Sequence, residues 1–189
     1  MIEQNERFNV TGLIGLADEV GTDILGYPVL GTDEDLPSLI KNRISAIVSI
    51  GQIKTPEQRI RLFQLLKEND CELPVIISPR AYVSKHAVIG EGSIIMHGAI
   101  VNAGAVIGRN CIVNSHALVE HDSVIADHCH ISTMSAINST VHVGTGSFIG
   151  SGSTVRQNTK IGEYCLIGMG QRVIKDCDDH TCIPPKKCR

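Results

Sequence analysis

Two histidines and two carboxylates within a short stretch are the residues of this chain best suited to chemistry. Glu120, His121 and Asp122 are consecutive, and His130 follows nine residues after the first histidine. An imidazole titrates near neutral pH, so a histidine beside a carboxylate can accept a proton from an attacking amine or hydroxyl. The same residue types also decorate exposed turns that have no function, and the pattern alone favours neither interpretation.

The elements that position these residues follow from a six-residue repeat. Every sixth residue from Ile77 to Val173 is isoleucine or valine, over seventeen positions that we call anchors. Neither an α-helix, with about 3.6 residues per turn, nor a flat strand, with a period of about two, produces this spacing. The spacing is typical of a parallel β-helix, in which each hexapeptide supplies one short strand and one turn. With three hexapeptides in each triangular coil, we expect about five to six coils whose interior is filled by the anchors.

The residues between the anchors support the same fold. All twelve glycines after residue 77 lie one or three places after an anchor, where a corner needs backbone angles that glycine adopts easily. Four places after an anchor the residue is small, except at Val141 and Gln171. Cys111 and Cys129 occupy this small position, so we expect the two thiols to stack on adjacent coils. No export signal is visible at the start of the chain, which favours reduced thiols and a cytoplasmic location.

Stacking in such coils predicts the surroundings of each candidate, because residues eighteen apart lie above one another. His121 is expected between two small residues, so that its ring has space around it. Glu120 is expected in a column of polar residues. His130 is expected between Ile112 and Phe148, an apolar setting that disfavours its protonated form.

Residues 1–75 lack the repeat and predict a small α/β layer. Strands are expected at Phe8–Ile14, Ile44–Ile50 and Leu73–Ile77, and helices at Thr32–Ile40 and Thr55–Asn69, the second with Thr55 as N-cap and Gln58 completing a capping box. This alternation predicts a parallel sheet. We therefore expect an α/β domain at 1–75, a β-helix domain at 76–176 and a C-terminal tail at 177–189.

The overall composition excludes some partners. The net charge is -3 and the pI is 6.2, which gives no reason to expect nucleic acid or an anionic membrane as a partner. No run of eighteen apolar residues is present, so no membrane span is expected.

The hexapeptide series resembles the left-handed β-helix acyltransferases, which are trimers that bind acetyl-CoA between neighbouring subunits. Within that group, three segments resemble the bacterial sugar acetyltransferases of the NeuD/PglD type. These segments are Gly26–Gly31, Glu120–Asp122 followed by His130, and Gly146–Gly150. The resemblance covers nearly the whole chain. It implies a left-handed parallel β-helix preceded by a small Rossmann-like α/β domain that is incomplete at its N-terminus, because the sequence contains no match to the family's opening strand and Gly-rich nucleotide-sugar loop.

The resemblance also implies roles for individual residues. His121 matches the general base, and Asp122 matches the acid that raises its basicity. The residues that match acetyl-CoA contacts are His130, Ser151, Met169 and Ser139, the last through a backbone N–H directed at the thioester oxygen. Gly51 alone matches a family substrate contact, and we expect Glu120, beside His121, to contact the substrate as well.

The sequence thus predicts an acetyl-CoA-dependent acetyltransferase, a homotrimer that acetylates an amino sugar for bacterial surface glycans, with the sugar free or carried on a nucleotide. One alternative is an O-acetyltransferase acting on a sialic-acid-type sugar. Another is a β-helix scaffold impaired by lack of the acceptor loop. A metal enzyme is the third: His116 and His121 have the spacing of the ligands in β-helical carbonic anhydrases, but Arg80 stands where a third histidine is required and cannot bind a metal. We therefore expect no metal site.

Overall fold

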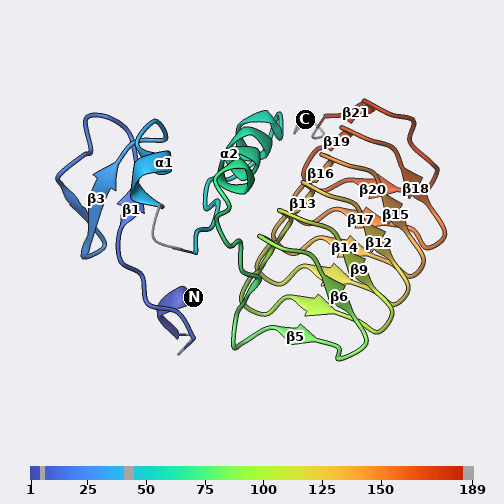
Figure 1. Cartoon of the computed structure of the whole chain (residues 1–189). Coiled ribbons are helices and arrows are strands. Elements are labelled where there is room, and N and C mark those ends of the chain that lie inside the picture. The colour runs from blue at the N-terminus through green and yellow to red at the C-terminus, as the bar shows by residue number, and fades with distance from the viewer. Residues whose placement is uncertain (5–6, 41–44, 185–189) are drawn as a thin grey trace.

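The computed structural model describes residues 1–4, 7–40 and 45–184, which form a solenoid of short strands and a smaller N-terminal part (Figure 1). The strands of the solenoid are two residues long and pair in parallel. They form the three faces of a prism and are joined by three columns of corners. The predicted left-handed parallel β-helix of hexapeptide repeats is confirmed.

Each face is one sheet, in which every strand pairs with the strands one coil before and after it. The first face contains β4 (Ile76–Ile77), β7 (Ile94–Ile95), β10 (Ile112–Val113), β13 (His130–Ile131), β16 (Phe148–Ile149), β19 (Leu166–Ile167) and β21 (Cys182–Ile183). The second face contains β5 (Tyr82–Val83), β8 (Ile100–Val101), β11 (Leu118–Val119), β14 (Ala136–Ile137), β17 (Thr154–Val155) and β20 (Arg172–Val173). The third face contains β6 (Val88–Ile89), β9 (Val106–Ile107), β12 (Val124–Ile125), β15 (His142–Val143) and β18 (Lys160–Ile161). We call the corner between the first and second faces the first corner, the next the second corner, and the one that leads back to the first face the third corner.

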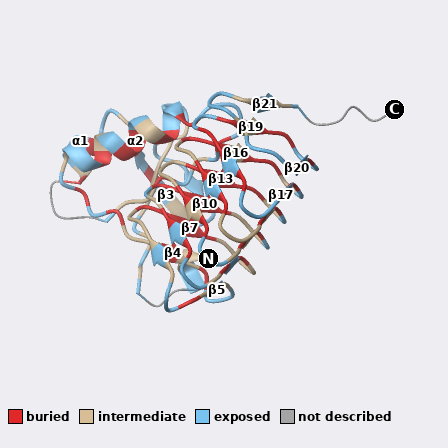
Figure 2. Ribbon diagram, turned by 90° about the vertical axis from the view of Figure 1, so that its right-hand side faces the viewer, coloured by how far each residue is buried: buried red, intermediate tan, exposed pale blue. Residues whose placement is uncertain are grey.

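The register of the solenoid is the predicted one. Ile112 pairs with His130, and His130 with Phe148, so the residues of β4 to β20 stack on one another at intervals of eighteen places. The last strand, β21, pairs sixteen places after β19. From Ile95 to Val173 every anchor is at most 4% exposed, and Figure 2 shows this buried interior along the strands. Burial of each such side chain contributes about 1.5–3 kcal/mol, so the solenoid is stabilised by a filled interior and any chemistry takes place outside it.

The corners share one unusual backbone conformation. The residue three places after each anchor has a positive φ at every turn from Gly92 to Gly170. Eight of these residues are not glycine, and among them are Asn110, His116 and Asp122. A left-handed residue costs about 1–2 kcal/mol for a side chain with a Cβ. The solenoid therefore bears this cost at eight corners, and at all but Met134 the residue has a polar or hydrogen-bonding side chain.

The N-terminal part differs from the prediction in its sheet. Its elements are a 3-10 helix at Ile2–Gln4, strands β1 (Leu13–Ile14), β2 (Asp23–Ile24) and β3 (Tyr27–Gly31), and helices α1 (Leu36–Leu39) and α2 (Glu57–Glu68). β3 pairs in parallel with β1 and antiparallel with β2, so the expected all-parallel sheet is wrong. The strand expected at Ile44–Ile50 begins outside the described residues; from 45 onwards it contributes one bridge, between Ser45 and Glu72. The strand expected at Leu73–Ile77 is β4, which belongs to the solenoid.

Both predicted helices form, but they are shorter than expected. Pro56 is the N-cap residue of α2, and Thr55 Oγ1 accepts a hydrogen bond of 3.3 Å from the Glu57 N–H. The expected capping box of Thr55 and Gln58 is wrong, because the N-cap is Pro56 and the Gln58 side chain bonds to no backbone N–H among the described residues. Neither helix of the described chain is long and apolar enough to cross a bilayer.

Helix α2 joins the N-terminal part to the solenoid and lies beside its first face (Figure 1). Phe63 of α2 packs edge-on against His128 of the third corner, with ring centroids 5.4 Å apart. A second hydrophobic core lies around this helix and consists of Leu36, Ile40, Val48, Leu62, Phe63, Leu66, Cys71 and Leu73. The second and third faces have no such cover within the described chain.

Candidate functional site

His121 and Asp122 form an exposed pair on the second corner. His121 Nδ1 lies 2.9 Å from Asp122 Oδ2, and the side chains are 55% and 64% exposed. A carboxylate accepts hydrogen bonds only, so Nδ1 carries the proton and the lone pair of neutral His121 is on Nε2. Asp122 has φ 58 and its carboxylate lies over Gly104, where a Cβ would clash with it. The pair can therefore accept a proton at Nε2 while Asp122 stabilises the resulting charge.

Glu120 fixes the backbone of this corner. Its Oε2 accepts a hydrogen bond of 2.8 Å from Asn102 Nδ2 and a longer one, 3.3 Å, from the His121 N–H. The polar column expected around Glu120 is thus present. The same carboxylate oxygen makes both bonds, which leaves its other oxygen as the acceptor for any group outside the corner.

Ser139 is stacked on His121, one coil further along the same corner. The neighbouring Thr140 N–H donates to the His121 carbonyl at 3.1 Å. The Ser139 N–H donates to no group among the described residues. The second corner therefore offers a backbone donor beside the histidine, in the column where the sequence resemblance put it.

His130 has very different surroundings, because it lies on the first face beneath residue Gln52. Its Nδ1 is 2.8 Å from the Gln52 carbonyl and its Nε2 is 3.1 Å from Asn114 Nδ2. The carbonyl can only accept, so Nδ1 carries the proton and Nε2 accepts from the amide. Burial lowers the pKa of His130; the bond to the Gln52 carbonyl opposes this and the charge of Arg59 adds to it. His130 is therefore neutral at pH 7, with both nitrogens occupied.

Ser151 and Met169 lie on the first corner, on adjacent coils. Ser151 Oγ is 2.9 Å from Ser132 Oγ, and the Ser151 carbonyl accepts from the Gly170 N–H at 2.9 Å. Met169 is 63% exposed. These two residues are separated from His121 by the whole width of the second face. Within one chain, the structure therefore holds the predicted site residues in two groups on different corners.

Gly51 lies in the irregular segment between residues 45 and 56, next to Gln52. It is exposed, and a Cβ built on it would have no described residue within 4 Å. A hollow of about 610 Å³ opens beside this segment, between the start of α2 and the third corner. Its lining includes Lys54, Gln64, Gly146, Tyr164 and His180. The exposed glycine and the hollow form a third region, separate from both of the other corners.

Comparison with known proteins decides the family. Residues 86–121 match the model of the bacterial transferase hexapeptide (six repeats). Perosamine N-acetyltransferase from Caulobacter crescentus, solved as a histidine variant with CoA and GDP-perosamine, is 32% identical, with a TM-score of 0.84 over 92% of this chain and 82% of that chain. The chain belongs to the hexapeptide-repeat sugar acetyltransferases. The prediction of a β-helix sugar acetyltransferase is thus confirmed.

One further structure supports this family, and another supports its fold. The acetyltransferase domain of PglB from Neisseria gonorrhoeae, with acetyl coenzyme A, is 31% identical, with a TM-score of 0.84 over 94% of this chain and 86% of that chain. WeeI from Acinetobacter baumannii has the same fold at 24% identity, with a TM-score of 0.80 over 90% of this chain and 81% of that chain. No curated protein matches the chain.

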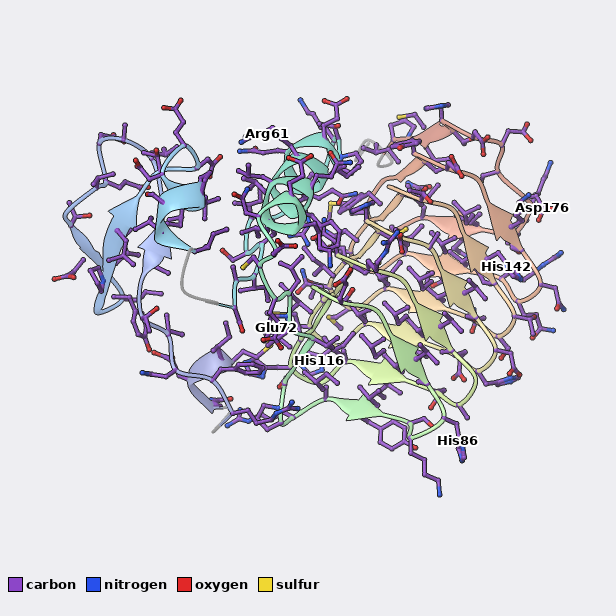
Figure 3. The ribbon with its side chains drawn as sticks, viewed as in Figure 1. Arg61, Glu72, His86, His116, His142 and Asp176 are labelled. Carbon is purple, nitrogen blue, oxygen red and sulfur yellow. The ribbon has the colours of Figure 1, made fainter. Side chains whose placement is uncertain are left out.

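The histidines outside the site of this sugar acetyltransferase are dispersed. His86 lies on the second corner, His116 on the first corner and His142 on the third face (Figure 3). His116 and His121 are at opposite ends of β11. No three histidine, cysteine or carboxylate side chains gather as a metal site in the part of the chain that the structure describes.

Sequence reasoning missed the residues that surround His130 and Gly51. Gln52 and Arg59 each make a buried hydrogen bond there, and Asn114 makes a partly buried one to His130. Asn114 carries no distinguishing signal, because asparagine also stands one place after an anchor at 102 and 138. Gln52 and Arg59 belong to a segment without a repeat, and no periodicity places them on the solenoid.

Proposed function

We propose that this acetyltransferase transfers the acetyl group of acetyl-CoA to the amino group of a nucleotide-linked sugar. The exposed His121–Asp122 pair is the single observation that carries the proposal, because it leaves an unprotonated Nε2 facing outward. Support for the substrates comes from the relatives, of which one is solved with CoA and GDP-perosamine and another with acetyl coenzyme A. A bacterial surface glycan is the proposed destination of the product.

The proposed reaction needs no covalent enzyme intermediate, since a thioester is already activated. The neutral amine attacks the thioester carbon, and His121 Nε2 takes the proton that the nitrogen loses as its bond to carbon forms. The Ser139 N–H donates to the oxyanion of the tetrahedral intermediate. The carbon–sulfur bond then breaks, and the departing CoA sulfur recovers the proton from His121. Asp122 holds the imidazole in place and stabilises its positive charge during the step.

We propose a homotrimer in which the coenzyme lies between copies. His121 and Ser139 are on the second corner. The proposed coenzyme contacts Ser151 and Met169 are on the first corner. His130, the other proposed coenzyme contact, is buried on the first face. A neighbouring copy would bring a first corner to a second corner, as closed cyclic symmetry allows. The second face between these corners carries exposed apolar side chains, with Tyr82 58% exposed and Ile100 40% exposed, which suits burial against another copy.

The acceptor is proposed to bind at Gly51 and Glu120. Residues 1–75 would form the acceptor side, and residues 76–176 the acyltransferase domain. The tail at 177–189 receives no role, and its last residues, 185–189, lie outside the described residues. Acetyl-CoA is a cytoplasmic metabolite, so we propose that the enzyme acts in the cytoplasm.

The experiment is a thiol-release assay with acetyl-CoA and a panel of nucleotide-linked amino sugars, each paired with the hydroxy sugar of the same skeleton. We expect CoA release that depends on an amino sugar, and a product heavier by one acetyl group. Turnover of hydroxy sugars or sialic-acid-type sugars alone would replace the proposal with O-acetylation. Absence of acceptor-dependent release across the panel, with acetyl-CoA bound, would favour the scaffold.

A further inference from the structure

Arg59 of α2 is a buried guanidinium without a carboxylate partner in the described chain. It is 1% exposed. Its Nη1 donates to the carbonyls of Val48 and Ile50 at 2.9 and 2.6 Å, and its Nη2 donates to Oδ1 and the carbonyl of Asn110 at 2.7 and 3.2 Å. Asn110 belongs to the third corner of the solenoid. One side chain thus connects the irregular segment of residues 48–50 to the β-helix.

Burying the charge of Arg59 without a carboxylate costs free energy, which indicates that the geometry of its hydrogen bonds matters. Burial lowers the pKa of Arg59 to about 10, so the group stays charged at neutral pH. Its Nε has no hydrogen-bond partner among the residues that the structure describes. Apolar residues of similar volume often replace a buried charge without loss of stability. An apolar side chain could not, however, donate to three carbonyls that lack strand partners, and these would then be buried and unsatisfied.

A second set of bonds fixes the chain on the other side of Gly51. Gln52 Nε2 donates to the Gly146 carbonyl at 3.1 Å, and the Gln52 carbonyl accepts from His130 Nδ1 at 2.8 Å. Gln52 is 3% exposed. Gly51 is therefore an exposed residue whose two neighbours, Ile50 and Gln52, are both held by buried bonds to the rest of the molecule.

We propose that Arg59 and Asn110 are positioning residues for the acceptor: their buried bonds hold the backbone of Gly51 in the conformation that binds the sugar substrate. The inference rests on the proposed function, because it takes Gly51 as the acceptor contact. Arg59 itself does not reach the acceptor. Its role is to fix the conformation of the binding segment in advance, which lowers the entropic cost of binding. The bonds between Arg59 and Asn110 do not involve Ser151, Met169 or the His121–Asp122 pair, so we expect acceptor binding to depend on them more than coenzyme binding does.

The test is Asn110→Gly. Asn110 has φ 52, a conformation that glycine adopts easily, so the substitution keeps the corner. It removes the Oδ1 that accepts from Arg59, and also the Nδ2 that bonds to the Arg59 carbonyl and to His128 Nδ1. His116→Gly is the matched control, because His116 has φ 57, is exposed, and makes no side-chain hydrogen bond within the described chain. We expect Asn110→Gly to raise the acceptor KM roughly tenfold while kcat and the acetyl-CoA KM stay within about twofold. We expect His116→Gly to behave like the wild type.

A second variant and a second measurement complete the experiment. Arg59→Lys keeps the charge but cannot span both segments, so it gives the same comparison if Asn110→Gly fails to fold. Hydrogen exchange of residues 45–54 should be faster in both variants than in His116→Gly. The acceptor Kd in the presence of CoA, measured by calorimetry, requires no turnover, so it decides the positioning role even if the wild-type chain proves inactive. An unchanged acceptor KM and Kd, or an equal rise for both substrates, would overturn the proposal.

Discussion

The Nδ1 of His121 and the Oδ2 of Asp122 are 2.9 Å apart although the residues are adjacent in the chain. Asp122 is the left-handed residue of its corner, and the next coil below supplies a glycine, Gly104, under its carboxylate. The pair is thus assembled within one turn and supported by one stacked residue. Changes at this corner, at the first corner and at His130 should have distinct and measurable effects.

Removing the imidazole should abolish most of the turnover. We expect His121→Ala to lower kcat by about 10²–10⁴-fold, which is the usual contribution of a general base. Asp122→Asn should have a smaller effect, because the amide oxygen can still accept the Nδ1 hydrogen bond but carries no charge. Steady-state kinetics of thiol release measures both variants. Full activity of His121→Ala would rule out the assigned base.

Gly104→Ala should cost stability as well as activity. The new Cβ would clash with the carboxylate of Asp122, and φ is +73 at this glycine. Gly152→Ala is the matched control for stability, since its φ is +66 and nothing lies within 4 Å of the built Cβ. We expect about 1 kcal/mol of destabilisation for Gly152→Ala and about 2 kcal/mol or more for Gly104→Ala. Urea unfolding compares the two, and equal losses would contradict the steric argument.

Two inactive variants should restore activity when mixed in one oligomer. His121→Ala removes the base on the second corner, and Met169→Arg places a bulky charge at the proposed coenzyme contact on the first corner. If each site combines corners of two copies, co-expressed and doubly purified oligomers contain some sites with both corners intact, and thiol release reappears. Mixed oligomers that remain inactive would indicate that each site belongs to a single chain.

The stability of the protein should fall as the pH drops below neutrality. Burial holds the pKa of His130 below the ordinary value of 6.5, so just below that pH the unfolded chain binds more protons than the folded one. The contribution of His130 is complete above about pH 6.5 and is lost below it, at no more than about 1.4 kcal/mol per pH unit for one group.

Urea unfolding at pH 7.5 and pH 5.5 measures this dependence. His130→Gln should weaken it, whereas His142→Gln, at an exposed position of the third face, should leave it unchanged. An identical pH dependence in all three proteins would show that His130 does not contribute.

The solenoid could be predicted from the sequence because its period is a property of neighbouring residues. The anchors and the glycines follow one six-residue rule, and this rule also placed His130 between Ile112 and Phe148. The sheet of the N-terminal part could not be predicted in this way. β3 contains Pro28 and lies between a parallel and an antiparallel partner, and short strands of this kind depend on tertiary contacts that carry no local signal.

The sequence predicted the contact between side chains at the second corner, but not the contacts on the first face, which α2 covers. The consecutive His121 and Asp122 meet as the residue types suggested. The hydrogen bond from His130 to the Gln52 carbonyl, in contrast, joins residues seventy-eight places apart. The segment before α2 was expected to be a strand, whereas its carbonyls bond to Arg59 instead of to a neighbouring strand. A buried arginine has no signature in a pattern of apolar residues.

The left-handed corner at every sixth residue also limits how this chain can change in length. Deleting or inserting a single residue within 92–170 would shift every later residue by one place, so that the anchors leave the interior and other residues take the left-handed positions. An insertion of eighteen residues would restore both at once and add one complete layer. Lineages of this enzyme should therefore differ in length by whole layers, with smaller changes confined to loops that leave the prism and return to the same corner.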